Sequence, residues 1–247
     1  MNRIEKLEKN SINLLGKQNE KTEKLVIIGT GETAEIAYEY FTDYSPYEVV
    51  AFAVEREYLD KTKLFGLPVV PFENVEEIYP PEKYKAFVAV SYTKLNRVRA
   101  RLYHEAKRKG YTLVTFIHPT VFIGRDVEIG DNCFIFEYNN IQRKVKIGNN
   151  VVIWAKNHIG HRSVIKDHCY LASGVIISGF CEIGEYSFLG VNCSLNDRIK
   201  IAKDTIIGNG AIVVKDITEP GGVYVGNPAR RLPKSSYEVF GVRGDEI

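Results

Sequence analysis

From Ile117 to Val213, every sixth residue of the chain is a branched aliphatic residue. The run comprises seventeen consecutive hexads without a slip in register. A helix repeats its buried face about every 3.6 residues and a strand every second residue, so neither produces a period of six. A hexapeptide repeat is typical of a β-helix, in which short strands alternate with turns and the coils stack. Residues 117–232 are therefore predicted to form a parallel β-helix.

The fifth residue of each hexad is mostly small or β-branched, as expected for the second inward position of a narrow, densely packed prism. Three hexads make one triangular coil, so residues 18 apart are expected to stack. Asn139 and Asn157 have this spacing and predict an inward amide ladder. Glycine often follows the aliphatic residue, which predicts turns with positive φ at these positions: Gly124, Gly130, Gly148, Gly160, Gly184, Gly190 and Gly208.

All four cysteines fall in the small inward position of the repeat: Cys133, Cys169, Cys181 and Cys193. An even number of cysteines is compatible with disulfides or a metal site. No CxxC pair occurs, however, and a buried cysteine packs like a small hydrophobic residue. We therefore expect four buried free thiols, and with them a reducing, cytoplasmic compartment.

Length and charge limit the class of protein. The chain has 247 residues, enough for two modest domains, and a net charge of +2, which does not favour nucleic-acid binding. No stretch approaches 18 apolar residues, and the N-terminus lacks the apolar segment of a signal peptide, so neither a membrane span nor secretion is expected. Residues 1–24 are a polar extension, either a short docking helix or a loose tail.

Residues 25–116 predict a small α/β domain of Rossmann type. The apolar run at residues 25–28 is typical of a buried parallel strand, and further strands are expected at residues 49–54, 86–90 and 113–116. Residues 95–109 predict a charged amphipathic helix. The alternation of strands and helices favours a parallel sheet, and residues 233–247 form a tail after the second domain.

The first strand is followed by the GxGxxA turn Gly29-Thr30-Gly31-Glu32-Thr33-Ala34. Such a turn brings backbone N–H groups close to a phosphate at a helix N-terminus. Glu55, after the second expected strand, is placed to accept a ribose hydroxyl. The alternative is a tight turn without a ligand. A domain of this size suits a mononucleotide or nucleotide sugar better than NAD. The hypothesis of an NAD-dependent oxidoreductase is supported by this turn alone.

The small α/β domain followed directly by hexads resembles the sugar acyltransferases of the NeuD/PglD type. The resemblance rests on the turn in VIIGTG, on the hexads, and on the segments 211–216 (AIVVKD) and 226–230 (GNPAR). It implies a left-handed parallel β-helix, a homotrimer, acetyl-CoA as donor and a nucleotide-linked amino sugar as acceptor. The N-terminal domain would hold the nucleotide, and donor and acceptor would meet between neighbouring subunits.

The resemblance also implies a catalytic base, His161, two residues after a hexad aliphatic. A neutral imidazole can remove a proton from an acceptor ammonium. Gly179, one coil later, would donate its N–H to the thioester oxygen, or else be a plain turn glycine. His158 is a second candidate for the base. The family has an acid after the histidine, whereas this chain has Arg162.

The remaining expected contacts fall into three groups. Acetyl-CoA is expected at Gly179, Gly190, Gly208, Asn227, Pro228 and Arg230. The nucleotide sugar is expected at Gly29, Thr30, Gly31, Glu32, Glu55, Lys94 and Asn96, and Arg99 is a further candidate. For Lys94, Asn96 and Arg99, solvated polar residues at a helix N-terminus are almost as good an explanation. A basic strip of Arg143, Lys144, Lys146 and Arg162 could receive phosphates or be an ordinary solvated face.

The sequence therefore favours an acetyl-CoA-dependent N-acetyltransferase acting on a nucleotide-linked amino sugar in surface-glycan biosynthesis. Two alternatives remain: transfer to a sugar hydroxyl, and a non-catalytic trimer that binds nucleotide sugars, which Arg162 favours. A zinc site is not expected, because the spacings of His158, His161 and His168 do not match the coil period.

Overall fold

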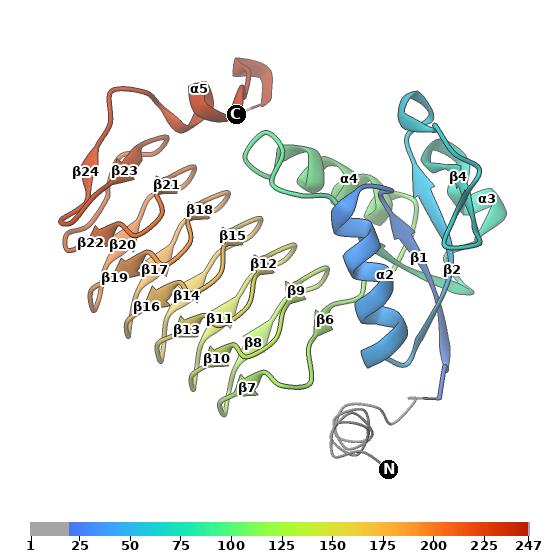
Figure 1. The fold of residues 1–247 in the computed structure, drawn as a ribbon, viewed down its shortest axis with the longest axis horizontal. Coiled ribbons are helices and arrows are strands. Elements are labelled where there is room, and N and C mark those ends of the chain that lie inside the picture. The colour runs from blue at the N-terminus through green and yellow to red at the C-terminus, as the bar shows by residue number, and fades with distance from the viewer. Residues whose placement is uncertain (1–19, 247) are drawn as a thin grey trace, which may run out of the picture.

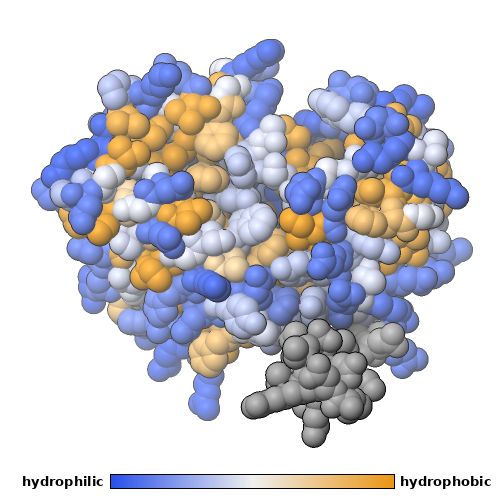
Figure 2. Space-filling model, in the orientation of Figure 1, coloured by the Kyte–Doolittle hydropathy of each residue, from blue (hydrophilic) through white to orange (hydrophobic). Residues whose placement is uncertain are grey.

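The computed structural model describes residues 20–246. Most of the extension predicted at residues 1–24, namely residues 1–19, lies outside the described residues. A β-helix and an α/β domain lie side by side, and the segment after the β-helix runs back toward the α/β domain (Figure 1). In the face seen in Figure 2, hydrophilic residues cover most of the surface and interrupt the apolar ones. The predicted order of two dissimilar domains is therefore confirmed.

The α/β domain contains a five-stranded sheet in the order β3-β4-β2-β1-β5, parallel except for the short edge pair β3–β4. Helix α2 covers one face of the sheet, where Ala37 and Phe41 pack on Leu25 and Phe52. Helix α4 covers the other face. The elements are β1 (Glu23–Ile28), α2 (Glu32–Tyr44), β2 (Tyr47–Val54), β3 (Lys63–Leu64), β4 (Leu67–Pro71), α3 (Val75–Ile78), β5 (Tyr84–Val88) and α4 (Arg97–Arg108).

The predicted strand at residues 113–116 is wrong. Leu113 forms only an isolated bridge to Ala86, and Phe116 already belongs to the β-helix. The first residue of this apolar run contacts the sheet of the α/β domain and the last begins the β-helix, which a local hydrophobic pattern cannot reveal. Strands β3 and β4 were not predicted, since Gly66 and Pro68 interrupt their pattern.

The predicted hexad register is confirmed at every coil. Each of the seventeen hexad aliphatics is the second residue of a two-residue strand, and each strand pairs in parallel with the strand 18 residues away. The strands form three faces: β6, β9, β12, β15, β18 and β21 (face C), β7, β10, β13, β16, β19 and β22 (face D), and β8, β11, β14, β17 and β20 (face E).

The bounds of these strands follow the repeat. They are β6 (Phe116–Ile117), β7 (Phe122–Ile123), β8 (Glu128–Ile129), β9 (Phe134–Ile135), β10 (Asn140–Ile141), β11 (Lys146–Ile147), β12 (Val152–Ile153), β13 (His158–Ile159), β14 (Val164–Ile165), β15 (Tyr170–Leu171), β16 (Ile176–Ile177), β17 (Glu182–Ile183), β18 (Phe188–Leu189), β19 (Ser194–Leu195), β20 (Lys200–Ile201), β21 (Ile206–Ile207) and β22 (Ile212–Val213). The segment after them contains β23 (Val223–Val225), β24 (Arg230–Arg231) and α5 (Ser236–Phe240).

The inside of the prism holds the aliphatic column and the small fifth residues. All four cysteines are buried and free, as predicted. The predicted ladder is also present: Asn139 Oδ1 accepts the backbone N–H of Asn157 at 2.8 Å, and Asn157 Oδ1 accepts that of Val175 at 2.6 Å. Each amide thus satisfies the backbone of the next coil, where an unpaired donor would be costly.

The prediction for the repeat glycines is wrong. None of the seven glycines after a hexad aliphatic has positive φ. The left-handed residue comes two positions later, at Asp126, Asn132, Asn150 and the equivalent residues. The glycines are needed for close approach instead. A Cβ at Gly160 would lie 2.4 Å from the carbonyl carbon of Ser178 in the next coil. Coil-to-coil distance, not backbone conformation, therefore explains these glycines.

Face C of the β-helix is the face that carries the α/β domain. Its outward residues are mostly large and apolar, and Phe134, Val152 and Tyr170 pack in one core with Phe41 and Phe87. Faces D and E are not packed against the α/β domain, and their outward residues include Asn140, His158, Lys146 and Glu182. The N-terminal domain is therefore attached to one of the three faces.

Candidate active site and nucleotide cleft

His161 lies on the turn between β13 of face D and β14 of face E. The turns of successive coils stack at this corner, so Arg143, His161, Gly179 and Asp197 follow one another at intervals of 18 residues. His161 is exposed, and its ring packs edge-on against Phe180 with a centroid distance of 5.1 Å. The structure therefore places the predicted base outside the prism.

The gap left by Gly179 separates His161 from an acid that was not predicted. A Cβ at Gly179 would lie 2.7 Å from Cε1 and 3.0 Å from Nε2 of His161, and 3.1 Å from Oδ1 of Asp197. Any side chain at position 179 would therefore fill the space between the imidazole and the carboxylate. Asp197 lies two coils beyond His161, and the 18-residue stacking rule, applied twice, would have found it.

The backbone N–H of Gly179 makes none of the hydrogen bonds found among residues 20–246, whereas the next N–H, that of Phe180, donates to the carbonyl of His161 at 2.9 Å. The Gly179 N–H is thus available to an incoming oxygen. A backbone donor held in a rigid coil is the kind of group that stabilises a developing oxyanion.

Cationic side chains surround this corner. Arg198 and Arg162 lie over the ring of Phe180, with guanidinium-to-centroid distances of 4.5 Å and 5.9 Å. On the face D side, an open groove of about 560 Å³ begins at His161. Its lining residues are Phe122, Gly124, Arg125, Gln142, Arg143 and His161. Of the predicted basic strip, Arg143 lines this groove, whereas Lys144, Lys146 and Arg162 line a shallow depression toward face E.

The other predicted histidines lie elsewhere. His158 is on face D between Asn140 and Ile176 of the adjacent strands, while His168 is buried at the corner between faces E and C. Within residues 20–246, no group of three or more His, Cys, Asp or Glu side chains is placed to hold a metal ion. The three histidines therefore do not form one cluster.

A second cleft, of about 590 Å³, lies at the carboxyl ends of β1, β2 and β5. The predicted turn residues Gly29, Thr30, Gly31 and Glu32 line it. Gly29 has a φ of +124°, and a Cβ there would lie 2.6 Å from the carbonyl oxygen of Ala89, so the turn requires glycine. A Cβ at Gly31 would meet no atom within 4 Å, which leaves the start of α2 open to the cleft.

Two predicted residues of this cleft are paired. Both carboxylate oxygens of Glu55 accept hydrogen bonds from Arg101, at 2.8 Å and 3.0 Å. Lys94 Nζ lies 2.5 Å from Glu246 Oε1, which brings the segment after α5 to the cleft wall. A ligand that used the charges of Arg101, Glu55 or Lys94 would have to replace these ion pairs.

Asn96 and Arg99 do not line the cleft. Asn96 is buried and donates from Nδ2 to the carbonyl of His168 at 2.8 Å. Arg99 is fully buried and donates to the carbonyls of Val88 and Asn132. Both side chains tie the start of α4 to the β-helix, a role that the local sequence did not reveal because it depends on the docked domain.

The loop before α4 is held in an unusual conformation. Lys94, Leu95 and Asn96 have φ of 50°, 52° and 64°, which is a run of three left-handed residues that are not glycine. Each costs roughly 1 kcal/mol or more, so contacts on both sides must hold them. Leu95 packs with Val223 and Val242, and Asn96 bonds to His168.

The residues predicted to line the acetyl-CoA channel are spread over the far end of the β-helix. Gly190 and Gly208 stack at the corner between faces C and D, and Gly190 is buried. Asn227 and Pro228 lie in the exposed connection between β23 and β24, and Arg230 is the exposed first residue of β24. Apart from Gly179, this group therefore lies away from the turn that carries His161.

The two candidate regions belong to different sides of the chain. The cleft is in the domain packed on face C, whereas His161 is on the corner that joins faces D and E. The corner brings together an imidazole, a carboxylate and a backbone N–H that has no partner among residues 20–246, and such groups can take up a proton and stabilise an oxyanion. The cleft offers the glycine turn and helix N-terminus that suit a phosphate.

The stacked hexads define the class of fold, a left-handed parallel β-helix preceded by an α/β domain. The family described as "Bacterial transferase hexapeptide (six repeats)" matches residues 144–179.

Solved structures extend the match to both domains. Perosamine N-acetyltransferase from Caulobacter crescentus, a histidine variant in complex with CoA and GDP-perosamine, is 25% identical, with a TM-score of 0.76, over 85% of this chain and 97% of that chain. The acetyltransferase domain of PglB from Neisseria gonorrhoeae, in complex with acetyl coenzyme A, is 25% identical, with a TM-score of 0.74, over 85% of this chain and 100% of that chain. The resemblance to NeuD/PglD-type sugar acyltransferases is thus confirmed.

A curated relative covers less of the chain. The acyl-[acyl-carrier-protein]–UDP-N-acetylglucosamine O-acyltransferase of Stutzerimonas stutzeri is 33% identical over 127 residues, which are 51% of this chain and 40% of the relative. The chain thus spans less than half the length of the curated relatives that it matches first.

Proposed function

We propose that this protein is an acetyl-CoA-dependent N-acetyltransferase that acts on a nucleotide-linked amino sugar used for surface glycans. The observation that carries this proposal is the arrangement at Gly179. The imidazole of His161 borders the space over this glycine, and the glycine's own backbone N–H makes no hydrogen bond among residues 20–246. The similarity over both domains to an enzyme that binds CoA and GDP-perosamine supports the same reaction.

In the proposed reaction, His161 takes a proton from the sugar ammonium, and the amine nitrogen attacks the thioester carbon. The Gly179 N–H stabilises the oxyanion of the tetrahedral intermediate. Collapse of this intermediate breaks the C–S bond and releases CoA. The thiolate takes up the second proton of the attacking nitrogen, and His161 returns the first proton to solvent. The products are an acetamido sugar nucleotide and CoA.

We further propose a homotrimer. The cleft that would hold the nucleotide and the corner that carries His161 lie on different sides of one chain, so we infer that a sugar held in the cleft does not reach the His161 of its own chain. Three chains around an axis would bring the cleft of one chain toward the corner of another. The expected compartment is the cytoplasm, in keeping with four buried free thiols. Within residues 20–246, no helix combines the length and apolar character of a membrane span.

The test is a screen of dTDP-, UDP- and GDP-linked amino sugars with acetyl-CoA, following release of free thiol. We expect one acceptor to give turnover, and the His161→Ala variant to lower kcat by roughly 100-fold or more. His158→Ala is the matched variant on the same coil, and we expect it to lose much less. Full activity of His161→Ala would remove the assignment, and absence of turnover with every acceptor would contradict the proposed activity.

Transfer to a hydroxyl is the second candidate, because several of the curated relatives are O-acyltransferases. Treating the product with mild base separates the two reactions, since an ester is hydrolysed and an amide survives. We expect the acetyl group to remain on the product.

A further inference from the structure

The residue that makes a hydrogen bond to the ring of His161 is not the one that follows it in the sequence. The chain has Arg162 at that position, and its guanidinium lies over Phe180. The imidazole instead contacts a residue from the coil below, Gln142, which follows β10 on face D. This contact is the only hydrogen bond that the ring makes to residues 20–246.

Two donors of His161 meet one oxygen of Gln142. The backbone N–H of His161 donates to Oε1 at 2.9 Å, and ring nitrogen Nδ1 lies 3.2 Å from the same oxygen. A backbone N–H can only donate, so the atom of Gln142 that faces it must be the amide oxygen and not the NH₂ group. The orientation of the amide is therefore fixed by the chain itself.

An amide oxygen can only accept hydrogen bonds, so Nδ1 must carry the proton in the neutral imidazole. The lone pair then resides on Nε2. A Cβ at Gly179 would lie 3.0 Å from this nitrogen, so Nε2 borders the gap between His161 and Asp197. The basic nitrogen is thus presented to the place where the proposed reaction needs it.

We propose that Gln142 is a positioning residue that holds His161 in the Nδ1–H tautomer, with Nε2 as the basic atom. The inference rests on the proposed function for its catalytic meaning, but the tautomer itself does not depend on any substrate. Gln142 performs with a neutral acceptor the orienting task that the related enzymes are expected to give to an acid. It does so without adding a negative charge beside the reacting groups.

The first test measures the tautomer in the substrate-free protein. Histidine labelled with ¹⁵N in its ring gives separate signals for protonated and bare nitrogens, and the loss of one set in His161→Ala assigns His161 among the five histidines. At a pH where the ring is neutral, we expect a protonated Nδ1 and a bare Nε2. In Gln142→Met, which keeps the length of the side chain but removes the acceptor, we expect a substantial population of the Nε2–H tautomer. A wild-type protein with Nε2–H would overturn the proposal.

The second test measures the reaction. Gln142→Met should lower kcat about tenfold while the KM for acetyl-CoA stays within about twofold, because the base is present but held in the productive tautomer for less of the time. Gln142→Glu restores an acceptor and should recover kcat, but with the acid limb of the pH–rate profile moved to higher pH, since a carboxylate stabilises the imidazolium. The neighbouring charges of Asp197, Arg143 and Arg162 are unchanged in both variants.

The matched control is Lys166→Met, which changes the same position of the repeat, directly after a hexad aliphatic, at the corner between faces E and C. It should leave the His161 signals and kcat unchanged. If Gln142→Met also leaves the tautomer and kcat unchanged, Gln142 has no positioning role. If no acceptor is ever acetylated but the tautomer responds as described, the proposed function fails and the assignment of the tautomer stands.

Discussion

Asp197 borders the gap at Gly179 on the side opposite Nε2 of His161. A carboxylate in this position attracts an ammonium group before it loses its proton. We expect Asp197→Asn to raise the KM for the amino sugar by up to about fivefold, the range of a partly exposed ion pair, because 56% of this side chain is exposed. The KM for acetyl-CoA should not change. Steady-state kinetics with both substrates varied would show this.

The control is Glu82→Gln, which removes the same formal charge from an exposed position in the α/β domain. It should leave both KM values unchanged. An equal rise of the two KM values in Asp197→Asn would indicate a general disturbance of the corner and would contradict a role in attracting the acceptor.

His168 makes the stability of the protein depend on pH. Burial lowers the pKa of His168 from 6.5 to about 4. The buried neighbour Asn150 donates to its Nδ1 at 2.9 Å, because Asn150 Oδ1 is occupied by Asn132, and protonation would break this contact. Between pH 6.5 and 4 the unfolded chain binds the proton and the folded chain does not. The stability provided by the neutral ring is therefore complete above about pH 6.5 and is lost as the pH falls toward 4.

We expect the free energy of unfolding to fall by up to about 1.4 kcal/mol per pH unit from this residue within that window. Urea unfolding at several pH values would measure the slope. His168→Gln should flatten it, although the variant is less stable at neutral pH, whereas His158→Gln, on face D and away from His168, should keep the wild-type slope. An unchanged slope in His168→Gln would contradict this explanation.

The residues that the sequence could locate are those whose position follows from the repeat. The period of 18 places Gly179 above His161, and the structure agrees. Asp197 obeys the same geometry, whereas Gln142 lies 19 residues before His161, one position off this spacing. Nothing in the local sequence of either residue marks it as different from other surface residues. Asn96 and Arg99 were predicted to contact the nucleotide sugar because the sequence pattern shows only a polar start of a helix. They are buried instead, since the β-helix packs over them, and local sequence does not show this packing.

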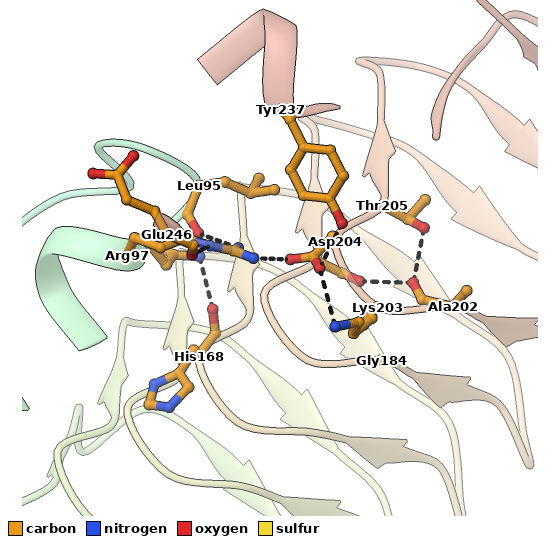
Figure 3. A network of polar contacts seen from close by, with 12 residues as sticks. Leu95, Arg97, His168, Gly184, Ala202, Lys203, Asp204, Thr205, Tyr237 and Glu246 are labelled. Carbon is orange, nitrogen blue, oxygen red and sulfur yellow. Dashed lines mark hydrogen bonds and ion pairs between the residues drawn. The ribbon is translucent and has the colours of Figure 1, made fainter. Parts of the chain in front are cut away.

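At the scale of elements, helices α4 and α5 are joined to the β-helix through Asp204. Its buried carboxylate accepts from Arg97 at 2.5 Å and from the hydroxyl of Tyr237 at 2.9 Å (Figure 3). The main-chain carbonyl of Glu246 in turn accepts from Arg97 Nε at 3.2 Å (Figure 3). One acid thus connects three segments that are far apart in the sequence.

Removing Arg97 would leave this buried carboxylate without its main cation. We expect Arg97→Met to lower the free energy of unfolding by about 3 kcal/mol, since an uncompensated buried charge costs far more than a surface ion pair contributes. Lys85→Met is the matched control, because its pair with Glu23 is partly exposed, and it should cost less than about 1 kcal/mol. Equal losses in chemical unfolding would show that the Asp204 cluster contributes no more than a surface pair.

The hexads predicted the elements of the β-helix because each aliphatic residue must point inward for the prism to close. The α/β elements were less predictable. The run at residues 113–116 is apolar because it passes between two cores, not because it forms a strand there, and its strand partner is set by tertiary packing. The same limit applies to the repeat glycines, because it is the close approach of the neighbouring coil that excludes a side chain at these positions.

At the scale of the whole molecule, the separation of the cleft from His161 has a consequence that can be measured without a structure of the assembly. Gly31→Leu places a side chain in the nucleotide cleft, and a Cβ at this position meets no atom within 4 Å, so the domain should still fold. His161→Ala removes the base at the other side of the chain. Each variant alone should form an inactive assembly, for a different reason.

Mixed assemblies of the two variants should be active if the cleft of one chain serves the corner of another. In a mixed trimer, which holds two chains of one variant and one of the other, one of the three sites combines an intact cleft with an intact corner, so about a third of the wild-type activity is expected from the purified mixed species. Sites built within one chain would give no activity, because no chain carries both intact groups. Co-expression with two different tags, followed by purification of the mixed species and a thiol-release assay, distinguishes these results. Activity that stays at the level of the single variants would contradict a site shared between chains, while a monomer in light scattering would contradict the trimer itself.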